Sequence, residues 1–219
     1  LYDNAMLGEN YKQASKFRIK NILAGTNQST EGMRMPPNWN WMKFDKKNIK
    51  AISRKFSKNK IRSFPAIGTL NYVYFEYFRK IRWVSFLDLF DYSKDKALDE
   101  LKKFDYRPYP YKHGESVFTR FYQGYILPKK FNVDKRKQHL SNLIVTNQIS
   151  RNEALEEIQS DPYNDPKSLQ EDIEYFLKKM KWSENDLEKY LARKPINHDF
   201  YNSEKKMWDL GKRIINSIK

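Results

Sequence analysis

The stretch "ILAGTNQSTEG", residues 22–32, decides how the fold of this chain is interpreted. Three apolar residues run directly into Gly25, which indicates a short buried strand that ends there. In open α/β sheets, ligands bind at the edge formed by the carboxyl ends of the strands. A glycine at that edge lets the backbone come close to a ligand, and Glu31 could hold a hard cation such as Mg²⁺. Further polar contacts would come from Thr26, Asn27 and Thr30. The alternative is an ordinary turn that leads into a capped helix.

The rest of the chain changes from mixed to helical character along its length. Amphipathic spacing predicts a helix over residues 4–20, and Asp45 is a predicted N-cap of the next helix. The segment 83–90, "WVSFLDLF", fits either a strand or a further helix. Ser150, followed three residues later by Glu153, has the form of a capping box. We therefore expect an α/β fold, with a partial sheet domain and its substrate loops in residues 1–133 and a helical C-terminal region in residues 134–219.

Composition limits the class of protein and of partner. The 219 residues include no cysteine and three histidines, so we expect neither a disulfide framework nor a structural zinc site. The net charge of +15 favours polyanionic partners, although a solvated lysine-rich surface is the plainer alternative. No segment approaches the roughly 20 apolar residues of a membrane span, so we expect a soluble cytoplasmic protein with no membrane partner. Because the chain does not begin with methionine, we also expect a piece of a longer protein.

A second polar cluster lies in "YKHGESVFTRFYQ", residues 111–123. Side chains of three charge types crowd around a glycine, as a ligand with phosphate or hydroxyl groups would require. The candidates are Lys112, His113, Glu115, Ser116, Thr119 and Arg120. The alternative is the start of a helix, with Arg120 in a surface ion pair.

A third cluster, "LPKKFNVDKRKQHLS" at residues 127–141, is strongly basic. Its cations could clamp a triphosphate or pyrophosphate, follow an RNA backbone, or form a solvated face. The cations are Lys129, Lys130, Lys135, Arg136 and Lys137, and His139 follows them.

Three segments together resemble the N-acetyl sugar amidotransferase family of bacterial surface-polysaccharide and lipopolysaccharide biosynthesis. They are "GTNQSTEG" (25–32), "KHGESVFTRFYQGYILPKKFNVDKRKQHLS" (112–141) and "ISRNEALEEI" (149–158). These enzymes are PP-loop ATP pyrophosphatases, so the resemblance implies an adenine-nucleotide-hydrolase-like sheet fold. It also implies that ATP activates the amide oxygen of an N-acetyl group on an activated sugar. Ammonia from a glutaminase subunit, which works with a cyclase-like subunit, would then give an acetamidino group.

The chain departs from this family in one respect, because the PP-loop signature Ser-Gly-Gly-x-Asp-Ser is absent and no two of the seven glycines adjoin. We therefore expect the C-terminal portion of such an enzyme, inactive on its own. The resemblance, together with that of "GTNQSTEG" to the NAD synthetase loop, implies a role for each candidate. ATP would be bound by Gly25, Thr26, Asn27, Thr30 and Lys130, and Mg²⁺ by Glu31. The catalytic residues would be Lys112, His113, Glu115, Lys135 and Arg136. The sugar would meet Ser116, Thr119, Arg120 and His139.

Two other functions remain open at this point. A tRNA-modifying PP-loop enzyme would suit the positive charge, and so would a basic nucleic-acid-binding module without catalysis. The basic residues are spread through the chain and form no RNA-binding motif. We therefore expect no nucleic-acid partner.

Overall fold

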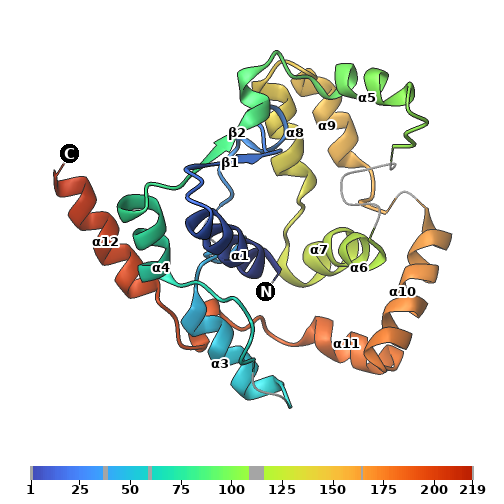
Figure 1. Cartoon of the computed structure of the whole chain (residues 1–219). Coiled ribbons are helices and arrows are strands. Elements are labelled where there is room, and N and C mark those ends of the chain that lie inside the picture. The colour runs from blue at the N-terminus through green and yellow to red at the C-terminus, as the bar shows by residue number, and fades with distance from the viewer. Residues whose placement is uncertain (1, 37–38, 59–60, 109–115, 164, 219) are drawn as a thin grey trace. The chain divides into compact units, whose positions relative to one another are not determined.

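The computed structural model describes residues 2–36, 39–58, 61–108, 116–163 and 165–218. These residues form two compact units, and Figure 1 labels their helices and strands. Unit 1 comprises Leu1–Gly25, Asn40–Ser85 and Ile196–Lys219, and unit 2 comprises Thr26–Trp39 and Phe86–Pro195. Each unit is built from segments that are far apart in sequence, so neither forms from local contacts alone.

Unit 1 contains a small parallel sheet covered by helices. Strand β1 (Asn21–Ala24) pairs with β2 (Arg82–Ser85) in a register that aligns Asn21 with Arg82. The helices of unit 1 are α1 (Tyr2–Lys16), α3 (Lys46–Phe56), α4 (Thr69–Val73), the π-helical turn η1 (Tyr74–Phe78), the 3₁₀ turn η4 (His198–Phe200) and α12 (Lys205–Ile218). Parallel strands need a long crossover, and here residues 25–81 form it, first through α2 (Gln28–Glu31), which belongs to unit 2, and then through α3, α4 and η1.

The core of unit 1 joins α1 to the crossover. The ring of Tyr11 on α1 is fully buried and stacks on Phe75 of η1, with 5.1 Å between the ring centroids. Ala14, Ile67 and Ile81 complete this cluster. Helix α12 lies beside α4 (Figure 1), because Trp208 meets the ring of Tyr72 edge-on at 5.6 Å. Aromatic contacts therefore attach the C-terminal helix to the segment that precedes β2.

Asp45 ties three segments of unit 1 together. As the N-cap of α3, its Oδ1 accepts the backbone N–H of Asn48 at 2.9 Å and that of Glu204 at 3.1 Å. Its Oδ2 accepts from the indole of Trp41 at 2.9 Å and from the hydroxyl of Ser203 at 2.5 Å. The carboxylate is only 2% exposed, so these four donors replace the water that it loses on burial.

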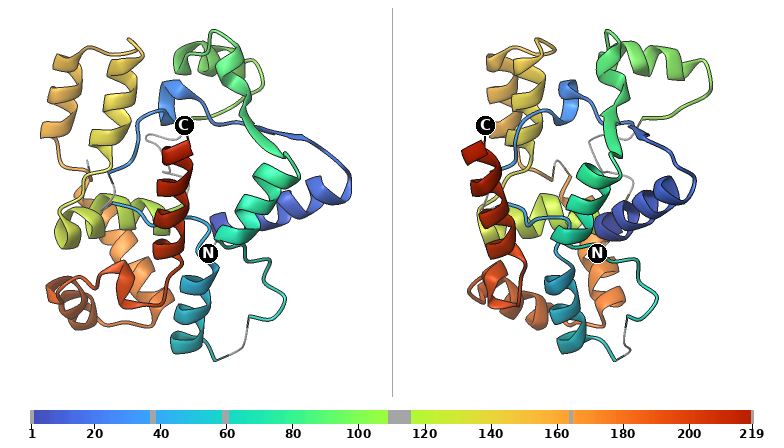
Figure 2. Two further views of the ribbon diagram at one scale, coloured as in Figure 1. Left: turned by 90° about the vertical axis from the view of Figure 1, so that its left-hand side faces the viewer. Right: turned by 60° about the vertical axis from the view of Figure 1, so that its left-hand side comes forward.

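Every helix or strand that the structure describes in unit 2 is a helix. Its elements are α2 (Gln28–Glu31), the 3₁₀ turn η2 (Phe86–Leu89), α5 (Lys94–Lys102), α6 (Val117–Phe121), the π-helical turn η3 (Tyr122–Ile126), α7 (Leu127–Phe131), α8 (Arg136–Val145), α9 (Arg151–Gln159), α10 (Pro166–Met180) and α11 (Glu184–Ala192). Helices α8 and α9 pack side by side, as both views of Figure 2 show. Phe121 and Phe176, 4.8 Å apart, join α6 to α10 in the core.

Several expectations from the sequence are confirmed. Residues 22–24 lie in a parallel strand, Asp45 and Ser150 cap helices as predicted, and helices α8 to α12 fill most of residues 134–219. The strand is not the buried one that the apolar run indicated, because Ile22 and Ala24 are half-buried and Leu23 is 63% exposed. The segment 83–90 begins as strand β2 and continues as the 3₁₀ turn η2. The fold agrees with the α/β expectation only coarsely, because the described chain is mostly helical and its sheet has two strands.

The two compact units do not divide at residue 133, where the sequence suggested a domain boundary. That boundary, and the PP-loop sheet domain, remain predictions. Among the described helices, none combines the length and apolar character that crossing a bilayer requires.

The four bonds to Asp45 lead to a stability prediction. In Asp45→Asn, an amide nitrogen replaces one acceptor oxygen, so buried donors lose their partner. We expect the free energy of unfolding to fall by about 2 kcal/mol, measured by urea denaturation. Asp209→Asn is the control, because Asp209 forms an exposed ion pair with Lys205 and should change stability by no more than ~0.5 kcal/mol. Equal effects in the two variants would contradict the role given to Asp45.

Candidate functional site

The segment after β1 is held by side chains from later in the chain. The backbone N–H of Gln28 donates to Oδ1 of Asp88 at 2.7 Å, and the hydroxyl of Ser29 donates to the carbonyl of Tyr92 at 3.2 Å. Asn27 is buried, whereas Thr26 and Glu31 are exposed. A Cβ added at Gly25 would meet nothing within 4 Å, and its φ is not positive. Neither packing nor backbone angle demands glycine there, and the open space is compatible with the close approach of a ligand.

Helix α2 packs against α8, which brings two of the predicted clusters together (Figure 1). The amide oxygen of Asn142 accepts the backbone N–H of Met33 at 2.5 Å. The side-chain amide of Gln138 donates to the carbonyl of Met33 at 3.0 Å. Because both residues belong to α8, the "GTNQSTEG" segment is fixed along the helix that carries the basic run.

The helical geometry of α8 then divides the basic run between two faces. Lys135 and His139 are seven and three residues before Asn142, which places them on the same face as that residue and toward α2. Lys135 is the N-cap residue and already has helical backbone angles. Arg136 lies about 100° further round the helix from Lys135.

Arg136 is engaged on the side of α8 that faces α9. Its guanidinium forms an ion pair with Asp134 at 2.8 Å. It also donates to the carbonyl of Glu157 and to the hydroxyl of Ser160, both at 3.2 Å. Lys135 and His139 therefore lie on the α2 side of the basic run, whereas Arg136 joins two helices.

Arg120 also makes internal contacts. Its Nε donates to Oδ2 of Asp172 at 2.6 Å, and its Nη2 donates to Oδ1 at 2.5 Å. The hydroxyl of Tyr163 donates to the same carboxylate. Asp172 is 3% exposed, so the arginine neutralises a buried charge. The surface ion pair that the sequence suggested as an alternative is in fact largely buried, and it joins α6 to α10.

Lys130 caps the C-terminal end of α11. Its ammonium donates to the carbonyls of Tyr190 and Arg193, which belong to the last turn of that helix and its C-cap. It also lies 4.4 Å from the ring centroid of Tyr190. Burial, and then the charge of Arg193, lower the pKa of Lys130. A cation at a helix C-terminus complements the helix dipole, so this lysine has a structural function in unit 2.

Ser116 and Thr119 begin helix α6. Ser116 is the N-cap and accepts the backbone N–H of Thr119 at 3.3 Å and its hydroxyl at 3.0 Å. This is the helix start that the sequence offered as the alternative to a ligand site. Lys112, His113 and Glu115, like the side chain of Thr30 in α2, lie outside the part of the chain that the structure describes. Their assigned roles stay predictions.

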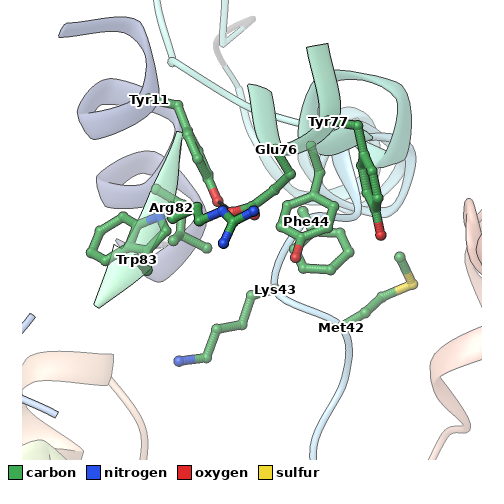
Figure 3. Close-up of a pocket in the computed structure, with 10 residues that line it drawn as sticks. Tyr11, Met42, Lys43, Phe44, Glu76, Tyr77, Arg82 and Trp83 are labelled. Atoms are coloured by element: carbon green, nitrogen blue, oxygen red, sulfur yellow. Dashed lines mark hydrogen bonds between the residues drawn. The ribbon is translucent and has the colours of Figure 1, made fainter. Parts of the chain in front are cut away.

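Unit 1 contains a separate pocket of about 670 Å³ (Figure 3). Half of its lining residues are aromatic, and three charged side chains reach it. The lining residues are Leu7, Tyr11, Met42, Lys43, Phe44, Tyr72, Glu76, Tyr77, Arg82 and Trp83. None of these was a candidate from the sequence, because they come from four separated segments.

Three further residues that hold the structure together were not singled out from the sequence. Asn142 and Asp172 are buried polar residues on helices, and Asp88 holds the start of α2. The available signal was a polar residue at a position where helical spacing expects an apolar one.

The described residues contain no group of three or more side chains that could together bind a metal ion. Mg²⁺ bound to a nucleotide commonly takes only one or two carboxylates from the protein, so Glu31 alone fits such a role.

Comparison with known protein families gives a match to part of the chain. Residues 115–215 match the family described as "LPS biosynthesis protein WbpG-like, C-terminal domain", which corresponds to a little under half of the chain. No curated protein and no solved structure matches the chain. The match supports, at a coarse level, the family that the sequence motifs indicate, and it points to lipopolysaccharide biosynthesis.

A stability measurement shows whether Arg120 serves to neutralise the buried Asp172 or to bind a ligand. Arg120→Ala leaves Asp172 buried without its cation, so we expect the free energy of unfolding to fall by about 3 kcal/mol, measured by urea denaturation. Lys179→Ala removes an exposed cation on α10 and should change stability by less than ~0.5 kcal/mol. If Arg120→Ala is as stable as the parent protein, the guanidinium is not needed by Asp172, and ligand binding becomes the better explanation.

Proposed function

We propose that this chain belongs to an ATP-dependent amidotransferase that converts the N-acetyl group of an activated sugar to an acetamidino group. One observation carries the proposal: α2 packs on α8, so that the segment Thr26–Glu31 and the Lys135 face of α8 lie together in unit 2. The match of residues 115–215 to a lipopolysaccharide biosynthesis family supports a sugar substrate.

The chemistry fits this set of side chains. ATP transfers its adenylyl group to the amide oxygen of the N-acetyl group, and pyrophosphate leaves. Ammonia attacks the activated carbon and loses a proton, and AMP departs with the former amide oxygen. The developing negative charge lies on the phosphates, where a lysine stabilises it. Lys135 would supply that charge, and His139, on the same face of α8, would contact the sugar.

Glu31 and its neighbours would hold the nucleotide. Mg²⁺, when bound, neutralises phosphate charge and orients the leaving pyrophosphate. The exposed carboxylate of Glu31 is a hard oxygen ligand of the kind this ion prefers. Thr26 and Asn27, together with the open space at Gly25, would form polar contacts to the nucleotide. The ammonia would come from a glutaminase subunit that works with a cyclase-like subunit.

The charge of Glu31 provides the first test. Glu31→Gln keeps size and polarity but removes the charge that Mg²⁺ needs. With ammonium salt replacing the glutaminase, we expect AMP release by the intact protein to fall about 10²-fold, while urea denaturation is unchanged. Glu156→Gln removes an exposed carboxylate of α9 and serves as the control. A full rate in Glu31→Gln across a Mg²⁺ titration would exclude Glu31 as a ligand.

Two lysines on different faces of α8 provide the second test. Lys135 faces α2, whereas Lys137 is exposed and lies about 200° further round the helix. In the same assay we expect Lys135→Ala to reduce AMP release by roughly 10²-fold and Lys137→Ala to have no effect. Equal losses in both variants would indicate that only the overall positive charge matters. RNA binding that weakens steeply with salt would then favour a nucleic-acid function.

A further inference from the structure

The pocket of unit 1 has the composition of a binding site for a small polar ring. Its lining comes from α1, from the loop before α3, from α4 with η1, and from the first residues of β2, all within unit 1. Phe44 and Tyr72 stack with their ring centroids 4.4 Å apart, and Tyr77 and Trp83 add further aromatic surface (Figure 3). Ligand sites are commonly pockets of this size, mainly apolar, with a few polar groups that fix the ligand.

The polar groups of the pocket offer both an acceptor and donors. The hydroxyl of Tyr11 donates to Oε1 of Glu76, and burial together with that carboxylate raises the pKa of Tyr11. A carboxylate can accept more than one hydrogen bond, so Glu76 retains acceptor capacity. Figure 3 shows the guanidinium of Arg82 directed toward this pair. No carboxylate of the described residues forms an ion pair with Arg82.

Lys43 supplies a second cation at the pocket. Its ammonium lies 3.2 Å from Asp3, and both side chains are about half exposed, at 53% each. An exposed pair of this kind is weak, so the lysine can turn to an anionic ligand at small cost. The pocket therefore combines aromatic faces, one hydrogen-bond acceptor and two cations.

The position of the pocket separates it from a nucleotide edge. Arg82 and Trp83 are the first two residues of β2, so the pocket adjoins the amino end of a parallel strand. Nucleotides bind beyond the carboxyl ends of parallel strands, and the "GTNQSTEG" segment leaves β1 at its carboxyl end. The pocket is therefore a site of its own within unit 1.

We propose that this pocket binds an anionic pyranoside, a sugar ring that carries a phosphate or carboxylate group. The choice of a saccharide rests on the proposed function. The flat C–H faces of the ring pack on the aromatic side chains, and a ring hydroxyl donates to Glu76. The anionic group pairs with Arg82, whose planar guanidinium binds such groups bidentately, and with Lys43.

Calorimetric titration without ATP tests the proposal, with glucose 1-phosphate and N-acetylglucosamine 1-phosphate as probes. We expect both to bind the parent protein, and Arg82→Ala and Tyr77→Ala each to weaken binding by about tenfold or more. Both side chains are exposed at the rim, so these variants should fold, which urea denaturation checks. Arg54→Ala removes an exposed cation of α3, outside the pocket, and should bind the probes normally.

Each contrary result has a definite meaning. If inorganic phosphate binds as tightly as the sugar phosphates, the two cations alone account for binding, and the proposal is overturned. Uridine diphosphate that binds more tightly and displaces them would make it a nucleotide site, which also overturns it. The proposal is also overturned if both variants bind the probes as the parent protein does, or if neither probe binds at millimolar concentration. Because no ATP is present, these outcomes do not depend on whether the Glu31 and Lys135 variants lose activity.

Discussion

The carboxylate of Asp45 is buried inside unit 1, and none of its four hydrogen-bond donors is a cation. The burial of this group constrains much of the unit. A buried carboxylate must be satisfied by hydrogen bonds, and its four donors come from residues 41, 48, 203 and 204. The loop before α3, the first turn of α3 and the approach to α12 must therefore meet at one point. Once they do, Trp208 of α12 reaches Phe44 and Tyr72, which are also walls of the pocket. The same carboxylate thus fixes the segments that shape a candidate ligand site.

The same requirement shapes unit 2 through Asp172 and Asn142. Asp172 is satisfied by Arg120 and Tyr163, which joins α6 to α10. Asn142 is satisfied through Met33, which holds the segment after α2 on α8. A buried polar side chain has few ways to be satisfied, so it fixes relative position more narrowly than apolar packing does. In this way unit 2 aligns the Thr26–Glu31 segment with one particular face of α8.

That alignment gives the basic residues different functions. In sequence, Lys130, Lys135 and Arg136 form one cationic run. In the structure, Lys130 caps α11, Arg136 joins α8 to α9, and Lys135 lies on the face toward α2. A run of basic residues is therefore by itself a poor indication of phosphate binding, because some of these residues cap helices or join them and so stabilise the fold. Lys135 shares a face of α8 with Asn142, which binds the backbone just after the "GTNQSTEG" segment, and it is the lysine that the proposed chemistry uses.

The sequence by itself determined the local elements. Ser93, Ser150 and Asp45 cap helices because a short polar side chain can reach backbone N–H groups two or three residues ahead. Strand β1 was visible as a short apolar run that ends at Gly25, and α10 to α12 as amphipathic helices. The tertiary structure alone decided that Arg120 faces a buried carboxylate and that Tyr11, Glu76 and Arg82 line one pocket. It also decided that α2 meets α8. These relations join residues dozens of positions apart, and periodicity and capping act only over a few residues. Which distant side chains meet depends on how the helices pack, which no local pattern encodes.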